Sequence, residues 1–220
     1  MGRSVLALAL LAVPALAQPS EITSVSPCVG CQTTAEQVRG DVSDRHWQTV
    51  AGGAIVTGDV HSHGANGSEQ HAVRAIGLVR EPPAKVWEVL IDFPGRLKWQ
   101  HDFTEIRVVR ADGERIWVAE KLKVLFVTIG FQIINTLHPD TGAISFEMDE
   151  SAPHDIAASK GFWQLAPSGD DQQQTLVAYH AWVDAGRYVP DFVQSFLLER
   201  SLPHVIDGLR EEVQRRFGAS

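Results

Sequence analysis

Residues 72–93 read Ala-Val-Arg-Ala-Ile-Gly-Leu-Val-Arg-Glu-Pro-Pro-Ala-Lys-Val-Trp-Glu-Val-Leu-Ile-Asp-Phe, and they combine two kinds of secondary-structure signal. The start of this stretch, with His71 before it, is rich in aliphatic residues and predicts a strand over 71–79. Glu81-Pro82-Pro83 ends the strand and begins a helix, because a proline in the first helical turn loses no hydrogen bond. Apolar residues then recur at helical spacing up to Leu90. The segment therefore predicts a strand followed directly by a helix.

Upstream of this segment the sequence predicts a second strand over residues 52–60. The stretch 61–70 is rich in glycine, serine, asparagine and histidine, and it predicts the loop that joins the two strands into a hairpin. A weak helical pattern begins at Thr34 and is interrupted by Gly40. Residues 18–33 are rich in serine, threonine and proline, with Gly30 among them, and show no periodicity, which indicates a loosely packed lead.

Downstream, Asp92-Phe93-Pro94-Gly95 breaks the helix and allows a short turn through Trp99. Segments rich in β-branched and aromatic residues follow, and turn residues separate them. These segments are 104–110, 115–121, 125–138, 143–149, 157–165 and 175–184. Neighbouring segments of this kind predict an antiparallel meander. Residues 188–217 then carry one apolar stripe at helical spacing, which predicts a long helix that Pro203 kinks near Ser201.

This order of elements resembles the START, polyketide cyclase and Bet v 1-like superfamily over about residues 70–217. Residues 72–93 are similar to its first strand and helix, and Lys98-Trp99 fits its short second helix. Tyr188-Val-Pro-Asp-Phe-Val, with Ser201-Leu-Pro after it, resembles the last-helix entry of the coenzyme Q-binding START-domain proteins. The resemblance implies an α+β helix-grip fold, in which a curved antiparallel sheet wraps around a long C-terminal helix and encloses a cavity.

The N-terminus has the features of a cleavable secretory signal. A basic start at Arg3 precedes an apolar run to Leu16, and Ala15-Leu16-Ala17 provides the small residues of a cleavage site. We therefore expect a signal peptide over 1–17 and a periplasmic or secreted protein; an uncleaved membrane anchor is the alternative. The expected organisation is a signal over 1–17, a lead with a short helix over 18–50, and a START-like domain over 51–220.

Two cysteines, Cys28 and Cys31, lie just after the expected cleavage site. Exported thiols usually oxidise, so a local disulfide is expected, with free thiols or a metal or redox role as alternatives. Gln32 stands where attachment of a c-type haem needs histidine, and there is no second cysteine pair for a zinc ribbon. The sequence therefore predicts no cofactor.

The composition restricts the partners of this chain. The hydrophobic content of 44% is enough for one core, and the net charge of −8 argues against nucleic acid or an anionic membrane as an electrostatic partner. The expected partner is a hydrophobic small molecule, with a transient membrane contact left open. The sequence does not indicate which oligomeric state the protein has.

Large side chains are concentrated in the segments that would line or cap a helix-grip cavity. Filling a core is the alternative role for each of them. On the last strand, either Tyr179 or His180 faces the cavity, depending on the register. The predicted ligand-binding residues are Trp99, Phe103, Trp117, Phe126, Phe131, Phe146, Trp163, Tyr179, His180, Phe192 and Phe196.

No arrangement of acids and bases in the sequence is diagnostic of catalysis, so no catalytic residue is predicted. His101-Asp102 and His154-Asp155 read as solvated loops. His61, His63 and His71 are spaced as metal ligands could be, but their glycine-rich setting predicts a solvated loop, and no metal site is expected. The glycines match neither a dinucleotide-binding nor a P-loop motif.

These expectations lead to one main functional hypothesis, an exported carrier of a lipid, isoprenoid or quinone-like molecule in a helix-grip cavity. The alternative is a cyclase-, aromatase- or hydrolase-like enzyme that uses polar cavity residues such as Glu120, Tyr179 or His180. A third hypothesis is an interaction module whose N-terminal segment docks a membrane protein.

Overall fold

A computed structural model describes residues 34–40, 42–63, 69–169, 171–184, 186 and 204–218, without the side chains of 59–63 and 69–71. Several expectations fall outside the described residues and stay predictions. They are the signal over 1–17, the Cys28–Cys31 disulfide, the ligand-binding roles of Phe192 and Phe196, and the kink at Pro203.

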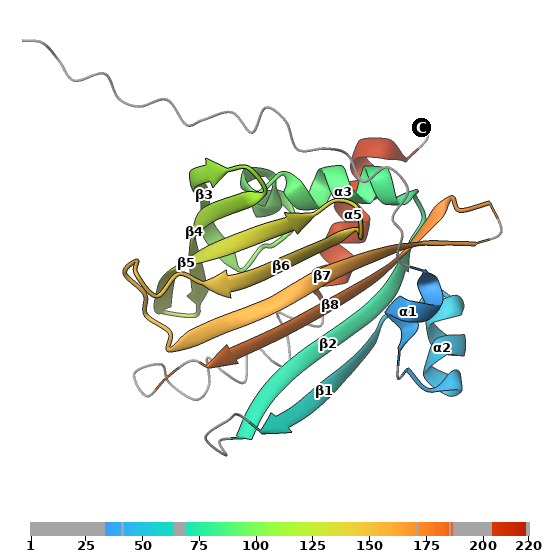
Figure 1. Cartoon of the computed structure of the whole chain (residues 1–220), viewed down its shortest axis with the longest axis horizontal. Helices are drawn as coiled ribbons and strands as arrows, with labels where there is room; N and C mark the ends of the chain where they lie inside the picture. The colour runs from blue at the N-terminus through green and yellow to red at the C-terminus, as the bar shows by residue number, and fades with distance from the viewer. Residues whose placement is uncertain are drawn as a thin grey trace, which may run out of the picture.

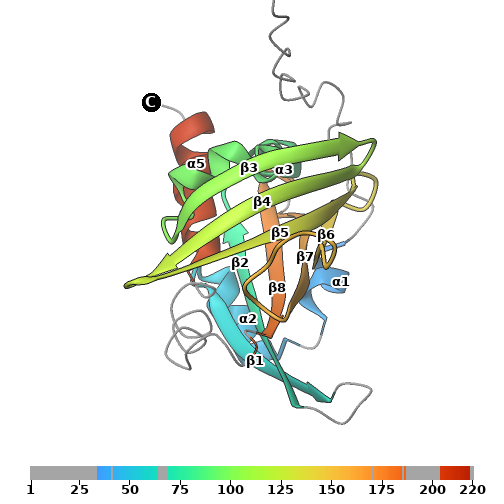
Figure 2. The same ribbon diagram turned by 90° about the vertical axis from the view of Figure 1, so that its left-hand side faces the viewer.

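The centre of the fold is one eight-stranded antiparallel sheet with the order β1-β2-β8-β7-β6-β5-β4-β3. The sheet is strongly curved (Figures 1 and 2). The strands are β1 (Val56–His63), β2 (Glu69–Val79), β3 (Phe103–Asp112), β4 (Arg115–Val124), β5 (Val127–His138), β6 (Ala143–Met148), β7 (Ala158–Ser168) and β8 (Gln174–Asp184). Strands β3 to β8 form the antiparallel meander expected from the sequence. Strand β2 pairs with β8, so β1 lies at one edge of the sheet and β3 at the other.

The helices lie on both faces of the sheet. They are α1 (Ala35–Arg39), α2 (Asp44–Ala51), α3 (Pro83–Ile91), the 3₁₀ helix η1 (Pro94–Lys98) and α5 (Val205–Phe217). α3 and α5 pack together, and their buried side chains join the main core with those of the inner sheet face. The sheet and α5 form the helix-grip arrangement. In the described part of the chain, no helix is long and apolar enough to cross a membrane.

The N-terminal helices cover part of the outer sheet face. Thr34 caps α1, and Gly40 ends it with a φ of 51°, a left-handed conformation that favours glycine. Val38 and Val50 then pack with Ile76 and Leu176 in a separate small core. The weak helical pattern in this region is therefore two short helices and not one.

Two predicted boundaries were wrong. Residues 61–70 were expected to form a loop, but the β1–β2 ladder continues to the pair His63↔Glu69, because consecutive cross-strand bonds satisfy this backbone despite its composition. The strand expected from Leu125 begins at Val127, since Val124 pairs with Val127 across a two-residue turn. Leu125 has a φ of 54° there, and no glycine or proline marks this turn in the sequence.

Contacts from α5 fix its position across the concave face. Gly208 allows the close approach, because a Cβ at this position would lie 2.5 Å from the Trp99 carbonyl oxygen. Arg210 Nε donates a hydrogen bond of 2.7 Å to the Leu78 carbonyl oxygen. Arg216 hydrogen-bonds Asp92 at the end of α3. The helix is therefore held against β2, α3 and the segment that follows η1.

Glu212 is the buried centre of the ion pairs on α5. Its carboxylate accepts two hydrogen bonds from Arg215 and one from Arg216, each of 2.7 Å. The bonds from Arg215, with those from Arg216, lower the pKa of Glu212 from 4.5 to about 2. A lowered pKa means that the ionised carboxylate stabilises the fold above pH 4.5, and that this contribution is lost as the pH falls to about 2.

We therefore expect Glu212→Gln to lower the free energy of unfolding at neutral pH by on the order of 2 kcal/mol. The difference from the wild type should shrink as the pH falls through the window between about 4.5 and 2. Urea unfolding at several pH values measures it. Glu147→Gln is the control, because Glu147 is exposed and makes no ion pair with the described residues. A difference for Glu212→Gln that is constant with pH would contradict this account.

Candidate ligand cavity

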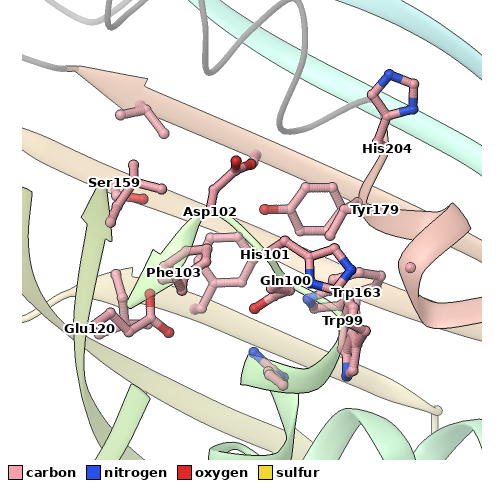
Figure 3. Close-up of a pocket in the computed structure, with 18 of the residues that line it drawn as sticks. Trp99, Gln100, His101, Asp102, Phe103, Glu120, Ser159, Trp163, Tyr179 and His204 are labelled. Carbon is pink, nitrogen blue, oxygen red and sulfur yellow. The ribbon is translucent and has the colours of Figure 1, made fainter. Parts of the chain in front are cut away.

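A cavity of about 650 Å³ lies between the concave sheet face, η1 and the start of α5. Figure 3 shows its labelled residues, which come from strands β3, β4, β7 and β8, from the segment after η1 and from the start of α5. This volume is in the range of sites that hold small molecules, about 300–1,000 Å³. The cavity is therefore large enough for a small-molecule ligand.

One wall of the cavity is aromatic. Trp163 packs against Trp99 with ring centroids 6.3 Å apart and against Tyr179 at 4.3 Å. Phe146 stacks on the other side of Tyr179 at 6.1 Å. Of the predicted ligand-binding residues, six line the cavity: Trp99, Phe103, Phe131, Phe146, Trp163 and Tyr179. The structure brings them together, and their contact with a ligand stays a prediction.

Gly161 on β7 allows Phe146 to adopt this position. The two residues are directly opposite each other across β6 and β7. A Cβ at position 161 would lie 2.4 Å from the Phe146 ring and 2.1 Å from the His180 carbonyl oxygen. The ring therefore lies over the bare glycine backbone and reaches Tyr179 on the next strand.

Three predicted ligand-binding residues lie elsewhere, and for them the prediction was wrong. Trp117 is on the outer face, between Arg110 and Arg115, whose guanidinium carbons lie 4.4 and 5.0 Å from its ring centre. His180 is also on the outer face and stacks on Phe162 at 5.2 Å. Phe126 lies in the β4–β5 turn and is 82% exposed.

The alternation of strand side chains explains two of these positions. On β4, Val118 and Leu122 are buried inward, so Trp117 faces outward. On β8, the cross-strand partner of Tyr179 is the buried Trp163, so Tyr179 faces inward and His180 outward. Phe126 was assigned to a strand that begins only after it.

Glu120 is an isolated carboxylate in this cavity. Among the described residues it has neither a hydrogen bond nor an ion pair. Part of its surface is accessible because it opens on the cavity, and the group itself lies deep in the protein. Burial raises its pKa from 4.5 to about 7, and the positive charge of Arg96 opposes this rise. Glu120 therefore titrates near neutral pH.

Arg96 is the buried cation beside this carboxylate. Its Nε and Nη2 donate to the Leu90 carbonyl oxygen at 3.0 and 2.6 Å, and its guanidinium lies 4.4 Å from the Phe93 ring centre. Burial lowers its pKa to about 10, although Glu120 and other groups oppose this. Burial, and then the charge of Glu120, also raise the pKa of Tyr179. The cavity therefore has a polar region beside its aromatic wall.

Two further polar groups in the lining have no hydrogen-bond partner among the described residues. They are the indole Nε1 of Trp99 and the amide Nδ2 of Asn135, both buried. Each is a donor, and an unpaired buried donor costs about 1–3 kcal/mol of stability. Neighbouring protein atoms cover both nitrogens, so a ligand in the cavity does not contact them in this arrangement.

Sequence reasoning had named Glu120 only as a candidate and had missed Arg96 and Asn135. Asn135 could have been found from the period of β5, since it continues the alternate series of Ile133 and Leu137. A polar residue in an apolar series is a signal of a buried polar site. Nothing in the local sequence of Arg96 distinguishes it from an exposed arginine. His101 and Asp102, expected in a solvated loop, line the cavity.

The model of the family described as polyketide cyclase/dehydrase and lipid transport matches residues 70–215. The chain belongs to this family. The matched range includes every strand from β2 to β8 and most of α5, so the cavity is formed within the family domain. The family assignment confirms the superfamily resemblance; the coenzyme Q-binding branch stays a prediction.

Proteins similar to this chain were found both by sequence and among solved structures. An uncharacterised protein of Pseudomonas aeruginosa is 22% identical over 71% of this chain and 82% of its own length. The crystal structure of an aromatase/cyclase from a Streptomyces species has a TM-score of 0.56 and 19% identity, covering 67% of this chain and 95% of its own.

A STAR-related lipid transfer protein from Xanthomonas axonopodis has a TM-score of 0.56 and 17% identity, covering 71% of this chain and 99% of its own. At these identities the likeness shows the helix-grip fold. It does not transfer a ligand or a reaction from either structure.

Glu120→Gln tests the electrostatics of the cavity. A raised pKa means that the neutral acid is favoured in the folded state, so stability is lost as the pH rises from 4.5 to about 7. The glutamine stays neutral, so we expect the variant to be more stable than the wild type above about pH 7, by on the order of 2 kcal/mol. The two proteins should be equally stable near pH 4.5. Urea unfolding against pH measures this, and an unchanging difference would refute it.

Proposed function

We propose that this protein is an exported carrier that binds a hydrophobic small molecule with a polar end in the helix-grip cavity. The observation that carries the proposal is the 650 Å³ cavity, with its aromatic wall and the carboxyl group of Glu120. The family description, which includes lipid transport, supports it. The proposed ligand class is a lipid, an isoprenoid or a quinone-like molecule.

The apolar part of such a ligand would supply enough binding energy. Burying about ten methylene groups at about 0.8 kcal/mol each yields about 8 kcal/mol, which corresponds to micromolar affinity before association costs. The aromatic wall formed by Trp163, Tyr179 and Phe146 offers this apolar surface. Apolar burial alone therefore suffices for a carrier.

The polar part of the ligand would be a neutral oxygen. Glu120 lines the cavity and makes no hydrogen bond with the described residues. Its pKa is about 7, and in its neutral form it donates a hydrogen bond, so a carbonyl or hydroxyl oxygen fits it. In its ionised form it would repel a carboxylate, which favours an alcohol, ketone or quinone over a free fatty acid.

Export is the second part of the proposal, and it rests on the signal-like residues 1–17. A carrier outside the cytoplasm would move an apolar molecule through an aqueous compartment. Polyketide chains attached to carrier proteins are normally cytoplasmic, so an exported location favours a carrier over a cyclase.

Neighbouring isoleucines on β5 test whether the cavity binds the ligand. Ile133 is buried and lines the cavity, whereas Ile134 lies on the outer face, directly opposite Trp117 on β4. We expect Ile133→Trp to fill part of the cavity and to weaken binding of an apolar ligand by about tenfold or more. Ile134→Trp makes the same change on the outer face and should bind like the wild type.

The measurements are native mass spectrometry of protein purified from its own periplasm and titration with the neutral apolar fluorophore Nile red. An apolar adduct should accompany the wild type and Ile134→Trp and be lost from Ile133→Trp. The same spectra report the mass of the chain, and so cleavage after Ala17. Absence of any adduct, with equal fluorophore binding by both variants, would refute the proposal.

A second candidate function is acid–base catalysis on the bound molecule, and Glu120 is the observation that favours it. General acids and bases work best with a pKa near the ambient pH, and burial brings the pKa of Glu120 to about 7. Tyr179 lines the same cavity, while His180 is on the outer face and is excluded from this role.

For an enzyme we expect turnover of ketone or ester substrates with a pH–rate inflection near 7, the pKa of Glu120. Glu120→Gln should lower kcat by about 100-fold or more and remove the inflection. His180→Ala is the matched control and should retain both. Equal rates for the wild type and Glu120→Gln would eliminate this function and leave the carrier.

A further inference from the structure

A second cavity, of about 460 Å³, lies between the end of α2, the end of β2, the start of β8 and α5. We call it the arginine pocket, after Arg80 and Arg210 in its lining. Of the residues that line it, only Glu211 also lines the ligand cavity. The arginine pocket is therefore a separate site, and its role is independent of the proposed carrier function.

Arg210 is a cation of this pocket that the sheet holds in place. Its Nε donates a hydrogen bond of 2.7 Å to the Leu78 carbonyl oxygen. Its Nη2 is covered by neighbouring protein atoms, and its Nη1 lies 3.6 Å from the Asp207 carboxylate, which is too long for a hydrogen bond. The side chain is 24% exposed, so part of a fixed guanidinium stays accessible to a ligand.

Arg80, which directly follows β2, is the second cation of the pocket. It is exposed, and among the described residues its side chain makes neither a hydrogen bond nor an ion pair. Burial lowers the pKa of Arg210, the charge of Asp207 opposes this, and the charge of Arg80 lowers the pKa further. The two guanidinium groups are therefore close enough to repel each other, and an anion between them would relieve the repulsion.

Two neutral side chains add hydrogen-bond donors to the lining. Gln174 lies at the start of β8 and Gln214 lies on α5. Among the described residues, neither side-chain amide makes a hydrogen bond. An amide nitrogen donates two hydrogen bonds, and a guanidinium donates five. Unused donors from three separate elements therefore line the same pocket, which is an arrangement suited to an oxyanion.

The acidic residues of the lining do not cancel the charge of the two arginines. Glu81 is already bound, because Lys85 Nζ donates a hydrogen bond of 2.7 Å to its carboxylate. Glu211 is exposed, and its charge is not among those that shift the pKa of Arg210. The arginine pocket therefore keeps a net positive charge, in a chain whose net charge is −8.

We propose that the arginine pocket binds the phosphoryl group of a small phosphorylated molecule, with Arg80 and Arg210 as its charged contacts. A phosphate monoester carries a charge of about −1.5 to −2 at pH 7, which matches two guanidinium groups better than a carboxylate does. The planar guanidinium also donates parallel hydrogen bonds to phosphate oxygens. The volume of about 460 Å³ leaves room for an organic part beside the phosphoryl group. A soluble phosphate ester and a phospholipid headgroup share this chemistry.

The experiment is calorimetric titration of the purified protein with glycerol 3-phosphate at constant ionic strength, with glycerol as the uncharged control. Arg80→Gln should weaken binding by about tenfold or more, because it removes a charge-assisted hydrogen bond. Arg80 is exposed and has no partner among the described residues, so this variant should fold normally. Arg107→Gln makes the same change at an exposed arginine on β3, outside the pocket, and should bind like the wild type. Glu211→Gln should strengthen binding, since it removes a negative charge from the lining.

Vesicle flotation distinguishes the two sources of the phosphoryl group. The vesicles are phosphatidylcholine with or without phosphatidate, and the proteins are the wild type, Arg80→Gln and Arg107→Gln. Binding of glycerol 3-phosphate supports a soluble ester. Binding to phosphatidate vesicles alone, lost in Arg80→Gln, supports a lipid headgroup. The proposal is overturned if the wild type binds neither probe, or if Arg80→Gln binds as tightly as Arg107→Gln.

Discussion

The period of two along each strand of the curved sheet is the constraint on which the rest of this structure depends. Because side chains alternate between the two faces of a strand, Tyr179 lines the cavity and His180 lies on the outer face, although the two are adjacent in the chain. The same alternation keeps Trp117 among arginines on the outside while Glu120 opens on the inside. A shift of one residue in any of these ladders would exchange the two faces.

Buried charge without a direct partner distinguishes the cavity from the rest of the core. The buried Glu212 has its arginines within hydrogen-bond distance, and its pKa falls. Among the described residues, Glu120 has only the more distant charge of Arg96, and its pKa rises. Both carboxylates are enclosed by protein. Their pKa values differ because Glu212 is hydrogen-bonded to arginines and Glu120 is not. Glu212 is therefore part of a structural ion pair, whereas Glu120 is a group that can respond to a ligand.

Much of the fold was predictable, because the strand pattern, the prolines before α3 and the turns at Gly113 and Gly142 are local signals. The site was less predictable, since the sheet face on which a strand side chain lies depends on the register of the strand pairing. Tyr179 and His180 were equivalent on the sequence, and only the pairing with β7 separates them. The limits of the β1–β2 hairpin were missed because ladder pairing outweighed the low strand propensity of residues 61–70. Arg96 was missed because its burial results from tertiary packing, whereas the alternation of β5 does mark Asn135 as a buried position.

Gly161 links the shape of the cavity to the pairing of two strands. A Cβ at this position would lie 2.4 Å from the Phe146 ring and 2.1 Å from the His180 carbonyl oxygen, so an alanine or serine would have to displace the β8 backbone as well as the ring. The ring of Phe146 therefore stays beside Tyr179 only while β7 and β8 keep their close pairing. A change in the cavity wall at this position is thus also a change in the sheet.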